Sequence, residues 1–136
     1  VTGDKLHAER YSILTQSFAE DARRQPAAAA TYYCGFDLIL RAVQIVIVGD
    51  KASPGVAAFR DVFRRTNLIN KIILSIAPGE QLYAGHPAAG KGQVDGKPTV
   101  YVCAGQSCSL PITDPNQLEL QLKTRVVSGG TATVSG

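Results

Sequence analysis

The sequence predicts an α/β fold, a small three-layer domain with a mostly parallel sheet of three or four strands, preceded by a helical hairpin. Two β-branched runs, residues 43–48 and 71–76, flank an amphipathic segment of helical periodicity at 54–65. A strand–helix–strand unit of this kind almost always forms a right-handed parallel crossover. Residues 1–41 contain no β-branched run and repeat their apolar side chains at helical spacing.

The hairpin is predicted from two helical patterns separated by a proline. Apolar side chains recur every three or four positions from about residue 4 to residue 24, and Asp4 is placed to cap the start of this helix. Pro26 ends it, and a second helix is expected over residues 26–40. Two helices of this length leave apolar faces that need a partner.

The crossover unit has a clear start and end for each element. The run 43–48 is typical of a strand covered on both faces, because it is β-branched almost throughout. Gly49 and Asp50 end this strand, and Ser53-Pro54 is typical of a helix start, with serine as the N-cap and proline at the first helical position. The run 71–76 follows as a second buried strand.

The remaining elements follow a loop. Residues 77–97 are rich in glycine, proline and alanine, and residues 98–103 are predicted to form a third strand. Asp114 followed by Pro115 predicts the start of the last helix, close to a capping box.

These elements divide the chain into three parts. Residues 1–41 are the helical hairpin and residues 42–124 are the α/β domain. Residues 125–136, rich in glycine, serine and threonine, have no packing pattern and are expected to form a disordered tail.

The composition excludes several classes of partner. The net charge of +3 is mild and no concentrated basic stripe is present, so no nucleic-acid partner is expected. No apolar stretch approaches the roughly 20 residues that span a membrane, so no membrane partner is expected. Three cysteines, an odd number, argue against a secreted disulfide scaffold and favour a reducing, cytoplasmic compartment. The opening residues have neither an initiator methionine nor a signal-peptide layout, which favours an excised domain.

Cys103 and Cys108 are the sharpest chemical feature. The four residues between them allow a tight loop that brings the sulfurs together, either as a disulfide or as half of a metal site. A zinc site needs about four ligands, and the two histidines, His7 and His86, follow no ligand spacing, so neither a metal nor a cofactor is predicted. The C-x-x-C redox spacing is absent. Two structural thiols are the favoured interpretation, and a redox pair remains open.

Cys34 lies in the second predicted helix beside aromatic residues. A buried, inert thiol is the expected state of a cysteine in apolar surroundings.

Gly49, Asp50 and Ser53 are the candidate ligand-binding residues. They follow the first strand at the carboxyl edge of the sheet, where open α/β sheets usually hold their ligands, and a helix N-terminus there favours a small anion or nucleotide. The loop lacks G-x-G-x-x-G, so helix capping without a ligand is favoured. No Ser–His–Asp set and no carboxylate pair is evident, so no catalytic residue is predicted.

The C-terminal third carries a family resemblance. The run VDGKPTVYVC at 94–103, followed by Cys108, Pro111 and Thr113-Asp114-Pro115, resembles the end of the spermatogenesis-associated protein 20-like (YyaL-type) family. Val46 to Asp50 is also similar, and the resemblance extends over nearly the whole chain. It implies a longer parent in which a thioredoxin-like domain precedes a six-hairpin, glycosidase-like α/α barrel. One departure is Gln106, because an aromatic residue often lies between the paired cysteines in that family.

The resemblance implies a role for each part. Residues up to about 41 would be the last helices of the barrel, and the rest would be the family's C-terminal α/β domain. The function expected is that of a non-catalytic accessory domain packing against the upstream barrel and thioredoxin-like domains of a carbohydrate-active or redox parent. Two alternatives remain: a thiol redox role of Cys103 and Cys108, and anion or nucleotide binding at the Gly49–Ser53 loop.

Overall fold

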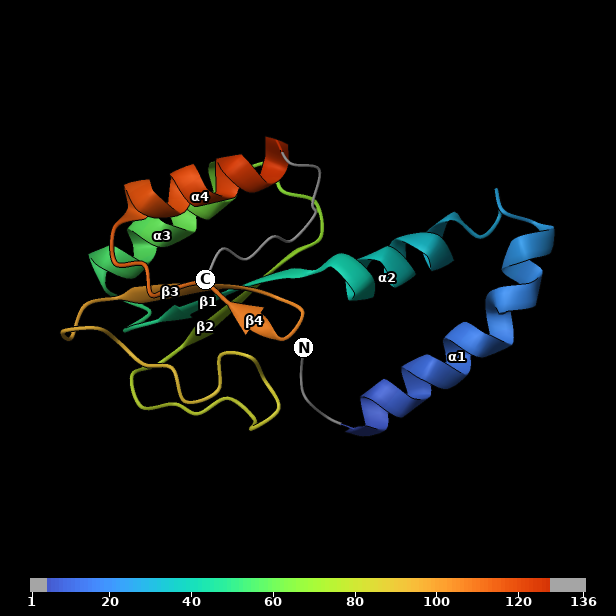
Figure 1. Ribbon diagram of the computed structural model, residues 1–136, viewed down its shortest axis with the longest axis horizontal. Helices are drawn as coiled ribbons and strands as arrows, with labels where there is room; N and C mark the ends of the chain where they lie inside the picture. The colour runs from blue at the N-terminus through green and yellow to red at the C-terminus, as the bar shows by residue number, and fades with distance from the viewer. Residues whose placement is uncertain (1–4, 128–136) are drawn as a thin grey trace. The chain divides into compact units, whose positions relative to one another are not determined.

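The computed structural model describes residues 5–127, which fall into two compact units divided between Arg41 and Ala42. The first unit holds two helices and the second an α/β domain (Figure 1). The elements are α1 (Lys5–Arg24), α2 (Ala30–Arg41), β1 (Val43–Val48), α3 (Pro54–Arg65), β2 (Lys71–Ile76), β3 (Thr99–Ala104), β4 (Ser107–Cys108) and α4 (Pro115–Val127).

The α/β class and the N-terminal helical hairpin are confirmed. The helix α4 continues to Val127, so the tail predicted from residue 125 begins too early. The remainder of that predicted tail lies outside the described residues, as does the predicted cap at Asp4.

The prediction of a mostly parallel sheet is wrong. The strand order is β2-β1-β3-β4, and of these neighbours β1 and β2 pair in parallel, whereas β1–β3 and β3–β4 are antiparallel. A parallel third strand needs a crossover that returns the chain to the opposite end of the sheet, usually through a helix. Residues 77–98, here called the β2–β3 loop, contain no helix and lead into β3 at the end of the sheet where β2 finishes.

The sheet has helices on one face within residues 42–127, so the predicted three-layer arrangement is also wrong. Both α3 and α4 cover the same face (Figure 1). The opposite face is covered by the β2–β3 loop, from which Leu82 and Ala88 pack on Val46 and Val48 of β1. The strand β1 is therefore buried on both sides as predicted, but a loop supplies the second cover.

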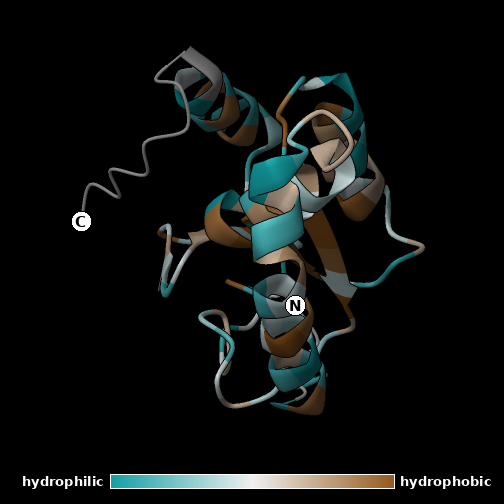
Figure 2. Cartoon of the chain, turned by 90° about the vertical axis from the view of Figure 1, so that its right-hand side faces the viewer, coloured by the Kyte–Doolittle hydropathy of each residue, from teal (hydrophilic) through white to brown (hydrophobic). Residues whose placement is uncertain are grey.

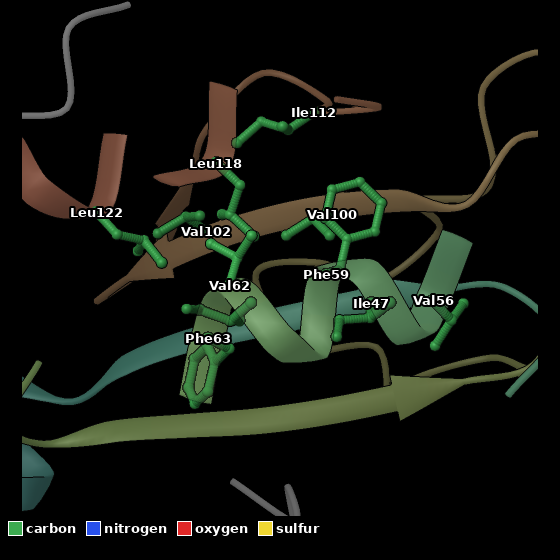
Figure 3. Close-up of a cluster of buried hydrophobic side chains, with 11 residues drawn as sticks. Ile47, Val56, Phe59, Val62, Phe63, Val100, Val102, Ile112, Leu118 and Leu122 are labelled. Atoms are coloured by element: carbon green, nitrogen blue, oxygen red, sulfur yellow. The ribbon is translucent and has the colours of Figure 1, made fainter. Parts of the chain in front are cut away.

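The main core lies between the helices and the sheet. Alternate residues of β1 and β3 point to this face, because successive side chains of a strand face opposite sides. Figure 3 shows Phe59 and Val62 of α3 and Leu118 and Leu122 of α4 converging over Val102 of β3. The full set of buried members is Ile45, Ile47, Val56, Phe59, Val62, Phe63, Val100, Val102, Ile112, Leu118 and Leu122.

The helical hairpin has little core of its own. Within residues 5–41, Ala22 alone is buried. Two tyrosine hydroxyls of α2 donate hydrogen bonds to backbone carbonyls of α1, Tyr32 to Thr15 at 2.9 Å and Tyr33 to Ala22 at 3.1 Å. These contacts connect the two helices but leave most of their apolar side chains uncovered.

Candidate functional site

Cys103 and Cys108 form a disulfide across the β3–β4 hairpin. The two residues are directly opposite each other in the antiparallel register, with a Cα–Cα distance of 3.9 Å. Gly105 adopts a positive φ of 57° in the two-residue turn that joins the strands, a conformation that glycine accepts without steric cost. The tight loop expected from the spacing is present, and it brings the two sulfurs into a covalent bond.

The two cysteines differ in exposure. Cys103 is 0% exposed within the sheet, whereas Cys108 is partly exposed on the short edge strand β4. Both side chains pack in the cluster on the loop-covered face, together with Tyr101 and Ala88. Among residues 5–127, no group of three histidine, cysteine or acidic side chains is placed to hold a metal ion.

Cys34 is exposed and free, contrary to the buried thiol expected in apolar surroundings. The apolar neighbours of Cys34 lie on α2, which has no buried residue in the structure. The sequence pattern was correct about the apolar surroundings, but nothing within the described residues 5–41 covers them.

Gly49, Asp50 and Ser53 lie together in one tight turn at the end of β1. The Asp50 carboxylate accepts the Ala52 N–H at 3.0 Å, and the Ser53 hydroxyl accepts the Val56 N–H at 3.3 Å. Both side chains therefore satisfy backbone groups at the start of α3, as expected for capping residues. The geometry assigns them a structural role.

The backbone of this turn is packed closely by the start of β3. A Cβ atom on Gly49 would lie 2.9 Å from Val56 Cγ2 and 3.3 Å from Pro98 Cβ, and one on Gly55 would lie 2.9 Å from Pro98 Cγ. Because β3 is antiparallel to β1, its first residues arrive at the edge where a parallel sheet would leave a crevice. Pro98 therefore packs directly against the backbone of this turn.

The two candidate groups lie at opposite ends of the sheet. Cys103 is paired with Gln44, near the start of β1, whereas Gly49 directly follows the end of β1. They cannot form one site.

His86 is the residue whose role sequence reasoning missed. It is 3% exposed in the β2–β3 loop, its Nδ1 accepts the Ala88 N–H at 3.0 Å, and its Nε2 lies 2.9 Å from Gln44 Oε1. The first contact leaves the proton of the neutral ring on Nε2, which donates to the Gln44 amide oxygen. A second hydrogen bond attaches the β2–β3 loop to the sheet, because the Tyr101 hydroxyl of β3 donates to the Gly92 carbonyl at 2.8 Å. A single polar residue, Gln44, in an otherwise apolar strand was the available signal.

We expect His86 to make stability depend on pH. Burial lowers the pKa of His86 from its ordinary value of 6.5, so below about pH 6.5 the unfolded chain binds a proton that the folded chain does not. The free energy of unfolding should therefore fall as the pH drops below that value and level off below the folded pKa. Urea unfolding between pH 8 and pH 5 measures this, and His86→Gln should flatten the dependence. If the two proteins give parallel curves, His86 does not attach the loop as described.

Among residues 5–127, no helix combines the length and apolarity needed to cross a membrane.

Comparison with known proteins finds sequences that are similar to most of this chain. The chain is 30% identical to spermatogenesis-associated protein 20 of Homo sapiens over 122 residues, which is 86% of this chain and 15% of that protein. The match to the Mus musculus protein has the same identity and coverage, and the Rattus norvegicus protein is 29% identical over 123 residues. This chain is a relative of spermatogenesis-associated protein 20. The resemblance inferred from the C-terminal motif is confirmed.

The match to spermatogenesis-associated protein 20 includes residues from both units of this chain. Its 86% share of the 136 residues is longer than either unit alone. Sequence similar to parts of both units therefore occurs together in a much longer protein, of which the chain spans only about 15%. No family model matches the chain, and no solved structure matches it.

Proposed function

We propose that this chain is a non-catalytic accessory domain from the C-terminal part of a longer polypeptide. In this proposal its helical hairpin packs against the upstream α/α barrel and thioredoxin-like domain that the family resemblance implies. The single observation that carries it is the apolar surface of α2, which has no buried residue.

The helix α2 is apolar on nearly all sides. A helix of this composition is normally buried in the interior of a larger protein. The large exposed side chains of α2 and their exposed fractions are Tyr33 43%, Phe36 40%, Leu38 37%, Ile39 54% and Leu40 66%. Neighbouring apolar side chains in such number indicate an interaction surface.

The helix α1 extends this surface within the same unit. Ile13, Leu14 and Phe18 are 63%, 55% and 54% exposed, and Leu14 and Phe18, four residues apart, lie on one face of the helix. Figure 2 shows hydrophobic and hydrophilic stretches alternating along α1. At the corner of the hairpin, Phe18 and Tyr32 line an open hollow of about 580 Å³. Its lining also includes Asp21, Arg24 and Gln25, and we infer that both polar and apolar side chains of upstream helices occupy it.

The non-catalytic part of the proposal is supported by how the ionisable side chains are used. The described salt bridges join residues three or four positions apart on exposed helix surfaces, such as Arg41–Asp37 at 3.0 Å and Lys123–Glu119 at 2.7 Å. Pairs of this kind contribute little energy and surround no cleft. The polar residue buried deepest in the β2–β3 loop, His86, has both ring nitrogens bonded to the protein itself.

The proposal predicts that this chain binds the separately produced upstream part of its own polypeptide. Leu14→Asp and Phe18→Asp should each weaken binding at least about tenfold, equivalent to about 1.4 kcal/mol, because each places a charge in the apolar contact. Gln16→Asp is the matched control, since Gln16 is exposed on the side of α1 opposite Leu14 and Phe18 and receives the same charge. Isothermal titration calorimetry measures the affinities. No binding by the unmodified chain, or an equal loss in all three variants, contradicts the proposal.

A second candidate function is favoured by the disulfide itself. In the reducing cytoplasm expected from the composition, protein disulfides are usually transient and either catalytic or redox-sensing. We therefore propose a thiol redox role of Cys103 and Cys108 as the alternative, in which the bond opens and re-forms in the folded chain.

A further inference from the structure

We propose that Cys108 is the sulfur at which a dithiol reductant opens the hairpin disulfide, and that Cys103 is the leaving thiol. This inference rests on the thiol redox role proposed above and assigns the two sulfurs different chemical tasks. The partner it implies is a molecule with two neighbouring thiols, either a small dithiol or a protein that carries a cysteine pair.

Access distinguishes the two sulfurs. Cys103 is 0% exposed, and its strand is paired on both sides, with Gln44 opposite it on β1 and Cys108 opposite it on β4. Cys108 is partly exposed and lies on an edge strand of only two residues, next to the exposed Ser107 of the same strand and directly after the exposed turn residue Gln106. The rate of thiol–disulfide exchange depends on which sulfur an incoming thiolate can reach.

The direction of attack strengthens this assignment. An incoming thiolate approaches the attacked sulfur in line with the S–S bond, on the side away from the leaving sulfur. Because the bond joins neighbouring strands, the approach to Cys108 comes from the open edge of the sheet. The approach to Cys103 comes from the side of β1, where Gln44 and the buried His86 side chain bonded to it occupy the face.

The reaction balances with a dithiol as the co-reactant. One thiolate of the dithiol attacks Cys108 Sγ, a new S–S bond forms, and the Cys103–Cys108 bond breaks with its electron pair passing to Cys103 Sγ. The Cys103 thiolate takes a proton from water. The second thiol of the reductant then loses its proton and attacks the reductant's own sulfur in the mixed disulfide, which releases Cys108 as a thiol. Two electrons and two protons pass to the protein, and the dithiol is oxidised to a disulfide.

The experiment traps the mixed disulfide of the first step with a monothiol. A monothiol has no second thiol of its own with which to complete the second step. Cys34→Ala removes the exposed free thiol, and this variant with its disulfide intact is treated with reduced glutathione, a monothiol, and quenched with N-ethylmaleimide. Peptide mass spectrometry then shows which cysteine carries glutathione and which carries maleimide. We expect glutathione on Cys108 at least tenfold more often than on Cys103 in the folded chain. In urea, where access is equal, the preference should disappear.

A parallel reaction with dithiothreitol separates the two levels of the proposal. If dithiothreitol opens the disulfide of the folded chain but glutathione is found equally on both cysteines, or mainly on Cys103, the assignment of sulfurs is overturned and the thiol role stands. If dithiothreitol opens the bond only after the chain unfolds, as followed by circular dichroism, the thiol role fails and this inference fails with it.

Discussion

Replacing Leu118 with alanine is expected to lower the free energy of unfolding by about 2–5 kcal/mol. Leu118 is 0% exposed on the inner face of α4, and Figure 3 shows it between Phe59 of α3 and Val102 of β3. The alanine would remove buried methyl groups and leave a cavity between two helices and the sheet. Both the lost burial and the cavity destabilise the folded state.

Leu120 provides a matched control for this prediction, since it lies on the same helix and is 68% exposed. Leu120→Ala makes the same chemical change and is expected to alter the free energy of unfolding by less than about 0.5 kcal/mol. Urea denaturation of the three proteins at one pH measures both values. Similar losses for Leu118→Ala and Leu120→Ala would show that α4 does not cover the sheet with the face described.

Gly49→Ala is the second substitution with a large expected effect, a destabilisation of about 1–3 kcal/mol. The new Cβ would meet Val56 Cγ2 at 2.9 Å and Pro98 Cβ at 3.3 Å, so either α3 or the start of β3 has to move. The prediction tests whether the turn at the end of β1 is closed by packing or open to a ligand.

The control for Gly49 is Gly92→Ala. Nothing lies within 4 Å of a Cβ at Gly92, and its φ is not positive, so alanine is expected to be neutral or to stabilise by about 0.4–1 kcal/mol. Thermal unfolding of both variants gives the comparison. A neutral result at Gly49 would mean that the turn has free space, and the anion-binding alternative at Gly49, Asp50 and Ser53 would regain support.

Local patterns predicted the elements of the crossover unit closely. The strands β1 and β2 match the predicted ranges, and Ser53 caps α3 as expected. These features depend on residues a few positions apart, so propensity and capping chemistry determine them. The direction of β3 depends instead on the route of the β2–β3 loop, which has no periodicity, and was therefore predicted wrongly.

The candidate site shows the same division between local and distant information. The closeness of Cys103 and Cys108 followed from their spacing, because a tight turn is local. The contact of His86 with Gln44 joins residues 42 positions apart, so the polar Gln44 in an apolar strand indicates a partner, but no local pattern identifies His86 as that partner. The difference in exposure between the buried Cys103 and the partly exposed Cys108 also depends on the position of β4 at the sheet edge. Only the strand order reveals this position.

The hairpin shows a third situation, in which the sequence indicated apolar helix faces whose cover does not lie within residues 5–41. Helical periodicity predicted both helices and their apolar faces, and the structure leaves those faces exposed. The exposed state of Cys34 has the same cause. Residues 5–41 contain no cover for these faces, and the proposed docking would supply one.

Amide hydrogen exchange of α1 and α2 would reveal whether the hairpin docks on the upstream part of the polypeptide. The longer polypeptide and the isolated 136-residue chain are compared at the same pH and temperature, with α3 and α4 as internal references. Docking predicts that amides of Ala30–Arg41 exchange at least tenfold more slowly in the longer polypeptide, while those of the α/β core change little. Equal exchange of α2 in the two proteins would contradict the account, because the apolar surface would then have no partner.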